Sequence, residues 1–173
     1  EHTRLGDGWS VQTATAFAPE VALPTTVAKL EVKNGHATKS MVIDRVWSWQ
    51  LLGTAVAWQE TVWAQVGNAV VSAVTALVVM SSSGKPKYTS ILGADAITAI
   101  DQTVVAAGWQ LFPGSTTSWG VAAATPGGGC VGEVAGRLIV PPGKALHVTF
   151  TGSIETASST HCGAAWFLAD LGS

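Results

Sequence analysis

Apolar and polar residues alternate along several short stretches of this chain, with the period of two that is typical of half-buried β-strands. Between residues 27 and 33, Ala28, Leu30 and Val32 fall on one face and charged residues fall on the other. The Asn34-Gly35 pair that follows is a common turn sequence. This part of the chain therefore predicts a strand that ends in a turn.

A second strand is predicted over residues 40–49. Strict alternation there places Ile43, Trp47 and Trp49 on one face and Val46 and Ser48 on the other. The same texture of Val, Thr, Ile and Trp predicts further strands over residues 56–66, 69–80, 97–105, 118–124, 131–140, 145–152 and 163–168. Clusters of Gly, Pro and Ser separate these stretches, and residues 141–144 (Pro-Pro-Gly-Lys) fit a tight turn.

Eight or nine strands joined by turns predict the fold class: an all-β, antiparallel two-sheet sandwich of jelly-roll type. Residues 25–173 form its single domain, because a chain of 173 residues is long enough for one hydrophobic core. Residues 1–24 show no clear period, and we interpret them as an extended N-terminal arm. Such an arm either lies across a neighbouring subunit or frays in solvent.

A helix within residues 54–80 is the main alternative, because Ala is frequent and Pro is absent there. The β-branched residues between Val70 and Val79 argue against it. Residues 62–80 also have the length of one membrane span, but polar residues interrupt them. A pair of buried strands is the better interpretation of this segment.

Charge is scarce in this chain, and the scarcity bears on its partners. Charged residues make up 12% of the sequence, against about 25% in an average soluble domain, and residues 102–132 contain none. A surface with so little charge favours burial against other subunits, so we expect a homo-oligomer. The Lys and Arg residues are scattered and form no basic stripe, so we expect neither nucleic acid nor a membrane surface as partner.

The two cysteines, Cys130 and Cys162, leave two alternatives open. They can form one disulfide between neighbouring strands, which would stabilise the fold by roughly 3 kcal/mol. They can equally remain buried free thiols, which behave as small apolar side chains.

No residue pattern in the chain matches a known catalytic or cofactor site. The four histidines lie outside any nucleophile motif, and His147 sits in an alternating segment where we expect it to face solvent. Cys130, His161 and Cys162 lack the close spacing of structural zinc ligands. The glycine-rich residues 125–130 lack the Lys-Ser/Thr of a phosphate-binding loop. We therefore predict no catalytic residues, no metal, no cofactor and no enzyme activity.

Eight tryptophans are the most unusual feature of the composition. Trp47, Trp49 and Trp166 lie in apolar segments, and we expect them to fill the core. Trp109 and Trp119 flank a loop of Pro, Gly, Ser and Thr, and are the better candidates for exposure. Exposed indoles there would stack on sugar rings or anchor an interface.

Residues 138–148 carry the most family-like pattern: a strand, a Pro-Gly turn and an alternating strand. An aromatic strand is predicted late in the chain, at residues 165–167, and an alternating segment lies early, at residues 30–34. Together, these features resemble small jelly-roll proteins of virus particles. These are the decoration or cement proteins of tailed phages and other viruses. The resemblance implies a non-enzymatic protein, dimeric or trimeric, that sits on a capsid lattice and clamps neighbouring subunits.

Two functional hypotheses follow. The first is a virion structural protein that decorates or cements a capsid, forms a homo-oligomer (a trimer is favoured) and contacts other capsid subunits. The second is a secreted, extracellular carbohydrate-binding sandwich whose partners are glycans held by Trp109 or Trp119.

Overall fold

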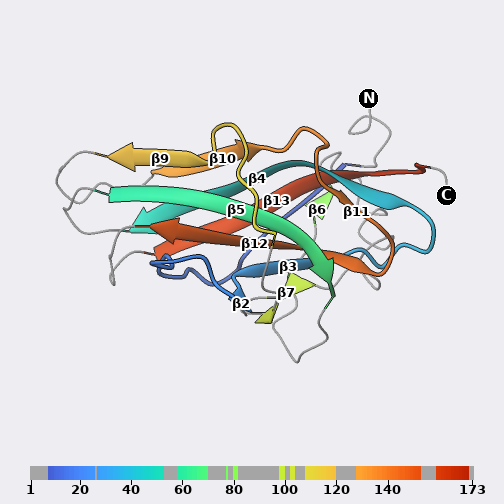
Figure 1. Cartoon of the computed structure of the whole chain (residues 1–173), viewed down its shortest axis with the longest axis horizontal. Helices are drawn as coiled ribbons and strands as arrows, with labels where there is room; N and C mark the ends of the chain where they lie inside the picture. The colour runs from blue at the N-terminus through green and yellow to red at the C-terminus, as the bar shows by residue number, and fades with distance from the viewer. Residues whose placement is uncertain are drawn as a thin grey trace.

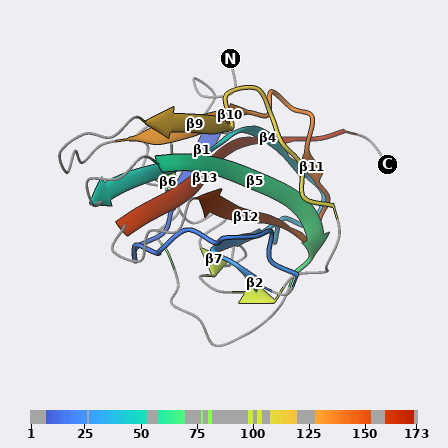
Figure 2. The same ribbon diagram turned by 60° about the vertical axis from the view of Figure 1, so that its left-hand side comes forward.

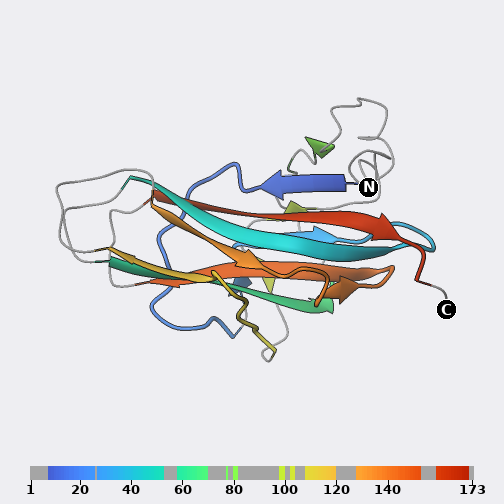
Figure 3. The same ribbon diagram turned by 90° about the horizontal axis from the view of Figure 1, so that it is seen from above.

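The computed structural model describes residues 8–25, 27–52, 58–69, 77, 80–81, 98–99, 102–103, 108–119, 128–152 and 159–171. This part of the chain forms thirteen β-strands and no helix, and the strands build two antiparallel sheets with a short extra ribbon (Figure 1). Seen from above, the two sheets lie as two layers, one over the other (Figure 3). The fold is therefore an all-β sandwich, as the alternation predicts.

Sheet A is ordered β10-β4-β13-β1-β6. It joins β10 (Gly129–Glu133), β4 (Ser40–Leu52), β13 (Ser159–Ala169), β1 (Gly8–Gln12) and β6 (Met80–Ser81). The short β11 (Ile139–Val140) also pairs with one end of β4. β4 and β13 run antiparallel along most of their length and form the centre of this sheet.

Sheet B is ordered β7-β3-β12-β5-β9. It joins β7 (Thr98–Ala99), β3 (Leu30–Lys33), β12 (Lys144–Gly152), β5 (Trp58–Asn68) and β9 (Thr116–Trp119). In Figure 2, β9 lies at the top of this sheet and β7 at its bottom. A two-stranded ribbon of β2 (Val27–Ala28) and β8 (Gln102–Thr103) completes the described strands. The jelly-roll connectivity stays a prediction.

The core lies between the two sheets and consists of the inward side chains of both. Sheet A contributes Trp9 from β1 and Trp166 from β13, which are directly opposite each other across the strand pair. Sheet B contributes Leu146, Val148 and Phe150 from β12, all fully buried. The predicted burial of Ala28, Leu30, Val32 and Trp166 is confirmed.

A β-bulge in β4 changes which residues face the core. Ala165 of β13 pairs with Arg45, but the next residue, Trp166, pairs with Ile43, so Asp44 is the extra residue. Ile43 faces the core before the bulge, and Val46 and Ser48 face it afterwards. The predicted strand is confirmed, whereas its strict alternation is wrong beyond Asp44.

The predicted arm over residues 1–24 is wrong for residues 8–12. These residues form β1, which lies inside sheet A between β13 and β6, with Trp9 and Val11 in the core. The segment after β1 crosses from one sheet to the other: Phe17 bridges to Thr160 of β13, and Glu20 bridges to Thr151 of β12. Residues 1–7 lie outside the described residues. The free energy gained by burying Trp9 and Val11 stabilises β1 in the sheet, because it exceeds the conformational entropy that this terminal segment loses.

The two predicted turns have different outcomes. Lys144 N–H donates to the Pro141 carbonyl, and Gly143 has φ of +76°, so residues 141–144 form the predicted tight turn with Gly at its left-handed position. The Asn34-Gly35 turn joins β3 of sheet B to β4 of sheet A and is therefore no hairpin. The buried Asn34 amide donates to the carbonyls of Lys39 and Val140, which fixes this passage between the sheets.

Within the segment proposed as an alternative helix, residues 58–68 form the strand β5, and residues 54–57 lie outside the described residues. Residues 70–76 and 78–79 lie outside the described residues. No helix in the part of the chain that the structure describes is long and apolar enough to cross a membrane.

Candidate functional site

The outer face of sheet A carries aromatic side chains because of the bulge at Asp44. Beyond the bulge, Trp47, Trp49 and Leu51 point away from the core while Ser48 and Gln50 are buried between them. Trp49 and Leu51 are each 46% exposed, and Val131 on the neighbouring strand β10 is 42% exposed. The expectation that Trp49 fills the core is therefore wrong, and Trp47 is only half-buried.

Two glycines on the neighbouring strands make room for these indoles. Trp47 leans over Gly163 of β13, where an added Cβ would lie 2.3 Å from the indole Cζ2 atom. Trp49 leans the other way, over Gly129 of β10, where a Cβ would lie 2.5 Å from its ring. A side chain at either glycine would push the indole off the sheet, so both rings lie close against the sheet because these positions have no Cβ.

A pocket of about 320 Å³ opens on the same face, between Gln12, Trp47, Trp49, Leu51 and His161. The His161 ring donates its Nδ1–H to the Thr13 carbonyl at 2.8 Å, which fixes the orientation of the ring. We call the six residues Gln12, Trp47, Trp49, Leu51, Val131 and His161 the tryptophan face. None of them is Lys, Arg, Asp or Glu.

Charged residues lie at one end of the tryptophan face rather than in it. Arg45 precedes Trp47 by two residues on β4, and it pairs in register with Glu133 of β10. The Arg45 Nε–H also donates to Asp44 at 2.8 Å. The outer surface of sheet A therefore has an apolar centre next to a charged border, which is the arrangement of protein interfaces.

The two cysteines are free thiols, and both are buried. Cys130 of β10 and Cys162 of β13 pair with the same residue, Ser48, from opposite sides of β4. Because neighbouring strands lie about 4.8 Å apart, the two Cα atoms are separated by about 10 Å. A disulfide needs less than about 7 Å, so this geometry excludes the disulfide and leaves the free-thiol alternative.

Glu60 is the most unusual ionisable group near the thiols. It lies on the inward face of β5, fully buried, and burial raises its pKa to about 7, an effect that the Ser48 side chain partly opposes. Burial also raises the pKa of the Cys130 thiol to about 11, and it raises the pKa of the Cys162 thiol even more. The Ser48 hydroxyl lies 3.1 Å from the Cys130 sulfur. These thiols are protonated at neutral pH and are therefore poor nucleophiles.

His147 is fully buried, and the expectation that it faces solvent is wrong. It lies on the side of sheet B that faces away from the core, where its Nε2 atom is 2.8 Å from a carboxylate oxygen of the equally buried Glu31. The two residues are direct partners across β12 and β3. Alternation correctly places both off the core face, but that face of sheet B is itself covered at this position.

The sequence singled out Trp109 and Trp119, and the structure describes the side chain of Trp109 alone. The Trp109 indole N–H donates to the Pro24 carbonyl at 2.9 Å, and its side chain is half-buried. Trp119 is the last residue of β9, and its side chain lies outside what the structure describes. Among the tryptophans whose side chains the structure describes, sequence reasoning missed the exposure of Trp49, because nothing in the alternation marks a bulge at Asp44.

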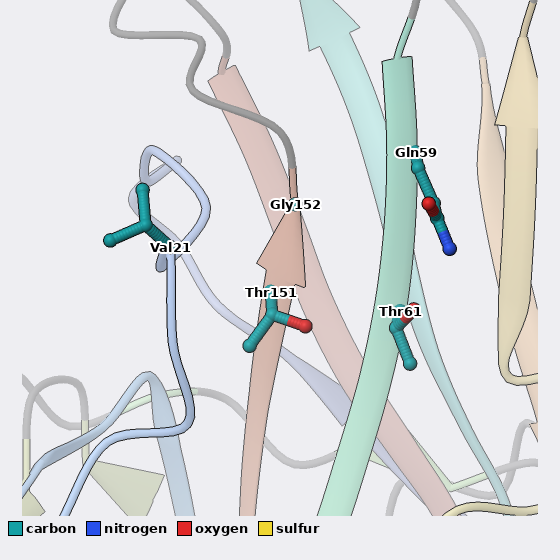
Figure 4. A pocket seen from close by; sticks show the side chains of 5 residues that line it. All are labelled: Val21, Gln59, Thr61, Thr151 and Gly152. Atoms are coloured by element: carbon teal, nitrogen blue, oxygen red, sulfur yellow. The ribbon is translucent and has the colours of Figure 1, made fainter.

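A second pocket, of about 330 Å³, lies on the outer face of sheet B and is lined by Val21, Gln59, Thr61, Thr151 and Gly152 (Figure 4). Thr61 and Gln59 come from β5, Thr151 and Gly152 from β12, and Val21 from the segment that crosses between the sheets. We call these five residues the polar pocket.

Among the described residues, no group of three or more His, Cys, Asp or Glu side chains could hold a metal ion. No known protein-family model and no curated protein matches this chain.

Proposed function

We propose that this chain is a non-enzymatic structural subunit of a virus particle, which decorates or cements a capsid through contacts between protein subunits. The observation that carries the proposal is the tryptophan face. An indole that is half exposed beside an exposed Leu and Val, without charge among them, has the composition of an interface centre.

The sandwich supports this proposal by the way it holds the face. Trp47 and Trp49 both belong to β4, and their rings pack closely over glycines of the two neighbouring strands, β13 and β10. A partner that docks there would meet side chains whose rotamers are already restricted, which lowers the entropy cost of binding. In this proposal the subunit forms a homo-oligomer, with a trimer favoured, and also contacts other capsid proteins.

The alternative is glycan binding through Trp109 or Trp119, and Trp109 gives it no support. The Trp109 indole N–H already has the Pro24 carbonyl as acceptor, and its side chain is half-buried, whereas the Trp119 side chain lies outside the described residues.

The experiment that tests the proposal compares the native mass of two variants with that of the unmodified protein. Trp49→Ser changes the tryptophan face, whereas Leu111→Ser changes an exposed apolar residue elsewhere, on the loop before β9. We expect sedimentation velocity to show dissociation in Trp49→Ser and an unchanged assembly in Leu111→Ser. Equal behaviour of both variants would contradict a role for the face. The virion assignment itself is tested by searching purified virus particles for peptides of this chain.

A further inference from the structure

The polar pocket is formed by outward side chains at the same end of β5 and β12. Residues 59, 61 and 63 alternate onto the outer face of sheet B, and so do residues 149 and 151 of β12, while Glu60 and Phe150 between them are buried in the core. Thr61 and Thr151 are direct cross-strand partners, and their side chains stand on either side of the space between the two strands (Figure 4).

Three of the five residues that line the polar pocket have neutral hydrogen-bonding side chains: Gln59, Thr61 and Thr151. Thr151 accepts the indole N–H of Trp63 at 2.9 Å, which leaves its own hydroxyl hydrogen for another acceptor. The Thr61 hydroxyl lies 3.2 Å from that of Thr116, so one of the two donates to the other. Gln59 is an exposed residue, and its side-chain amide contains both donor and acceptor atoms.

Among the described residues, an ion pair lies beside the pocket. Glu20, which precedes Val21, pairs with Lys29 at 2.6 Å, and the same ammonium group lies over the Phe17 ring. The backbone of Glu20 is hydrogen-bonded to that of Gly152, so this ion pair is held at the edge of the pocket. A phosphate or carboxylate ligand would need an unpaired cation, and the lining provides none.

We propose that the polar pocket binds one ring of a neutral saccharide. Two hydroxyls and one amide match the alternating donors and acceptors of a sugar ring. Val21, which is 70% exposed at the rim, offers apolar contact to the C–H face. A volume of about 330 Å³ is at the lower end of the range of about 300 to 1,000 Å³ for ligand pockets, so the site holds one ring rather than several. This site is independent of the proposed assembly function, because it lies on the opposite sheet.

The test uses the Trp63 indole N–H signal in a ¹H–¹⁵N spectrum, assigned with Trp63→Phe, during titration with glucose, galactose and N-acetylglucosamine. This N–H donates to the Thr151 hydroxyl, so a sugar that forms a hydrogen bond with the same hydroxyl alters the electronic environment of the N–H. We therefore expect a saturable change in its chemical shift with at least one sugar. The Trp49 indole N–H is the reference for the other sheet, and glycerol is the reference for a non-specific polyol effect.

Two variants decide whether the pocket itself binds. Gln59→Leu and Thr151→Val each remove one hydrogen-bonding group, and each should lower the affinity by about two- to tenfold. Gln110→Leu is the matched control, because Gln110 is an exposed glutamine that lines neither the polar pocket nor the tryptophan face, and it should leave the affinity unchanged. Gln59 is exposed, so its substitution leaves the fold intact, which the remaining amide signals verify.

Any one of four results would overturn the proposal. The first three are no saturable shift up to the solubility limit of the sugars, a response equal to that of glycerol, and an unchanged affinity in Gln59→Leu. A shift at Trp49 alone would place the sugar on the tryptophan face and would also overturn it. The oligomeric state of Gln59→Leu should equal that of the unmodified protein whatever the titration shows, so failure here leaves the assembly proposal untouched.

Discussion

At the scale of single residues, several polar and ionisable side chains of this sandwich are buried, and burial changes how they titrate and react. Glu60 is buried between the two sheets. The Glu31–His147 pair lies on the outer face of sheet B and is also fully buried. Alternation predicted the faces of Glu31 and His147 correctly, but periodicity reports only the side of the sheet and not what covers it. The sequence also left the state of Cys130 and Cys162 open. The register of β10 and β13 on β4 places both cysteines beside Ser48, on opposite sides of it, and thereby excludes a disulfide between them.

Glu60 should make the protein less stable as the pH rises. Its pKa is about 7 in the folded protein, against an ordinary value of 4.5, so between these values the folded state keeps a proton that the unfolded state releases. The free energy of unfolding therefore falls as the pH rises from 4.5 to 7, by roughly 3 kcal/mol in total from this group. Urea denaturation at pH 5 and pH 8 measures the difference.

Glu60→Gln should lose most of this pH dependence, because a neutral amide has no proton to release. Glu133→Gln, at an exposed position of β10, should retain it. A difference between pH 5 and pH 8 that is the same in Glu60→Gln and in the unmodified protein would contradict the assignment to Glu60.

The two thiols should resist alkylation until the protein unfolds. Both are buried, and the pKa of Cys130 is raised to about 11, so little thiolate forms at pH 8. Mass spectrometry after iodoacetamide treatment, without reductant, should find no modification of the native protein and two modified cysteines after denaturation. Recovery of a Cys130–Cys162 disulfide from denatured, unreduced protein would refute the register of β10 and β13 on β4.

At the scale of elements, the strands were predictable and the exceptions have identifiable causes. Ala28, Leu30 and Val32 alternate without interruption and are buried as expected, and Pro142-Gly143 adopts the turn that its residues favour. The outward position of Trp49 was not predictable, because a bulge depends on how β4 pairs with β13 and leaves no mark in β4 alone. β1 was missed because five residues are too few for a convincing period.

Deletion of residues 1–12 should unfold the domain rather than release a dispensable arm. The deletion removes a strand from between β13 and β6 and takes Trp9 out of the core. Loss of one large buried aromatic side chain alone costs about 3 to 5 kcal/mol, a large part of the stability of a small domain. Far-UV circular dichroism and thermal melting of the truncated chain measure the effect.

Deletion of residues 1–7 alone is the matched comparison, since β1 begins at Gly8. It should leave a cooperative melting transition. A folded, cooperative protein after removal of all twelve residues would show that sheet A does not need β1.

At the scale of the whole molecule, the two outer surfaces of the sandwich differ in character. Sheet A presents the tryptophan face, which is apolar and suits a protein partner, whereas sheet B presents the polar pocket, which suits a neutral ligand. The low proportion of charged residues predicts that another subunit covers part of the surface, but composition alone does not indicate which part. The structure assigns an exposed apolar centre to sheet A, and this assignment carries the assembly proposal.

The most direct test of the account is the native mass of the unmodified protein, measured by light scattering after size exclusion over a wide range of concentrations. The account predicts a homo-oligomer that persists on dilution, because we propose that a second subunit covers the apolar centre of the tryptophan face. A monomer of 17.7 kDa at every concentration would contradict self-assembly through this face.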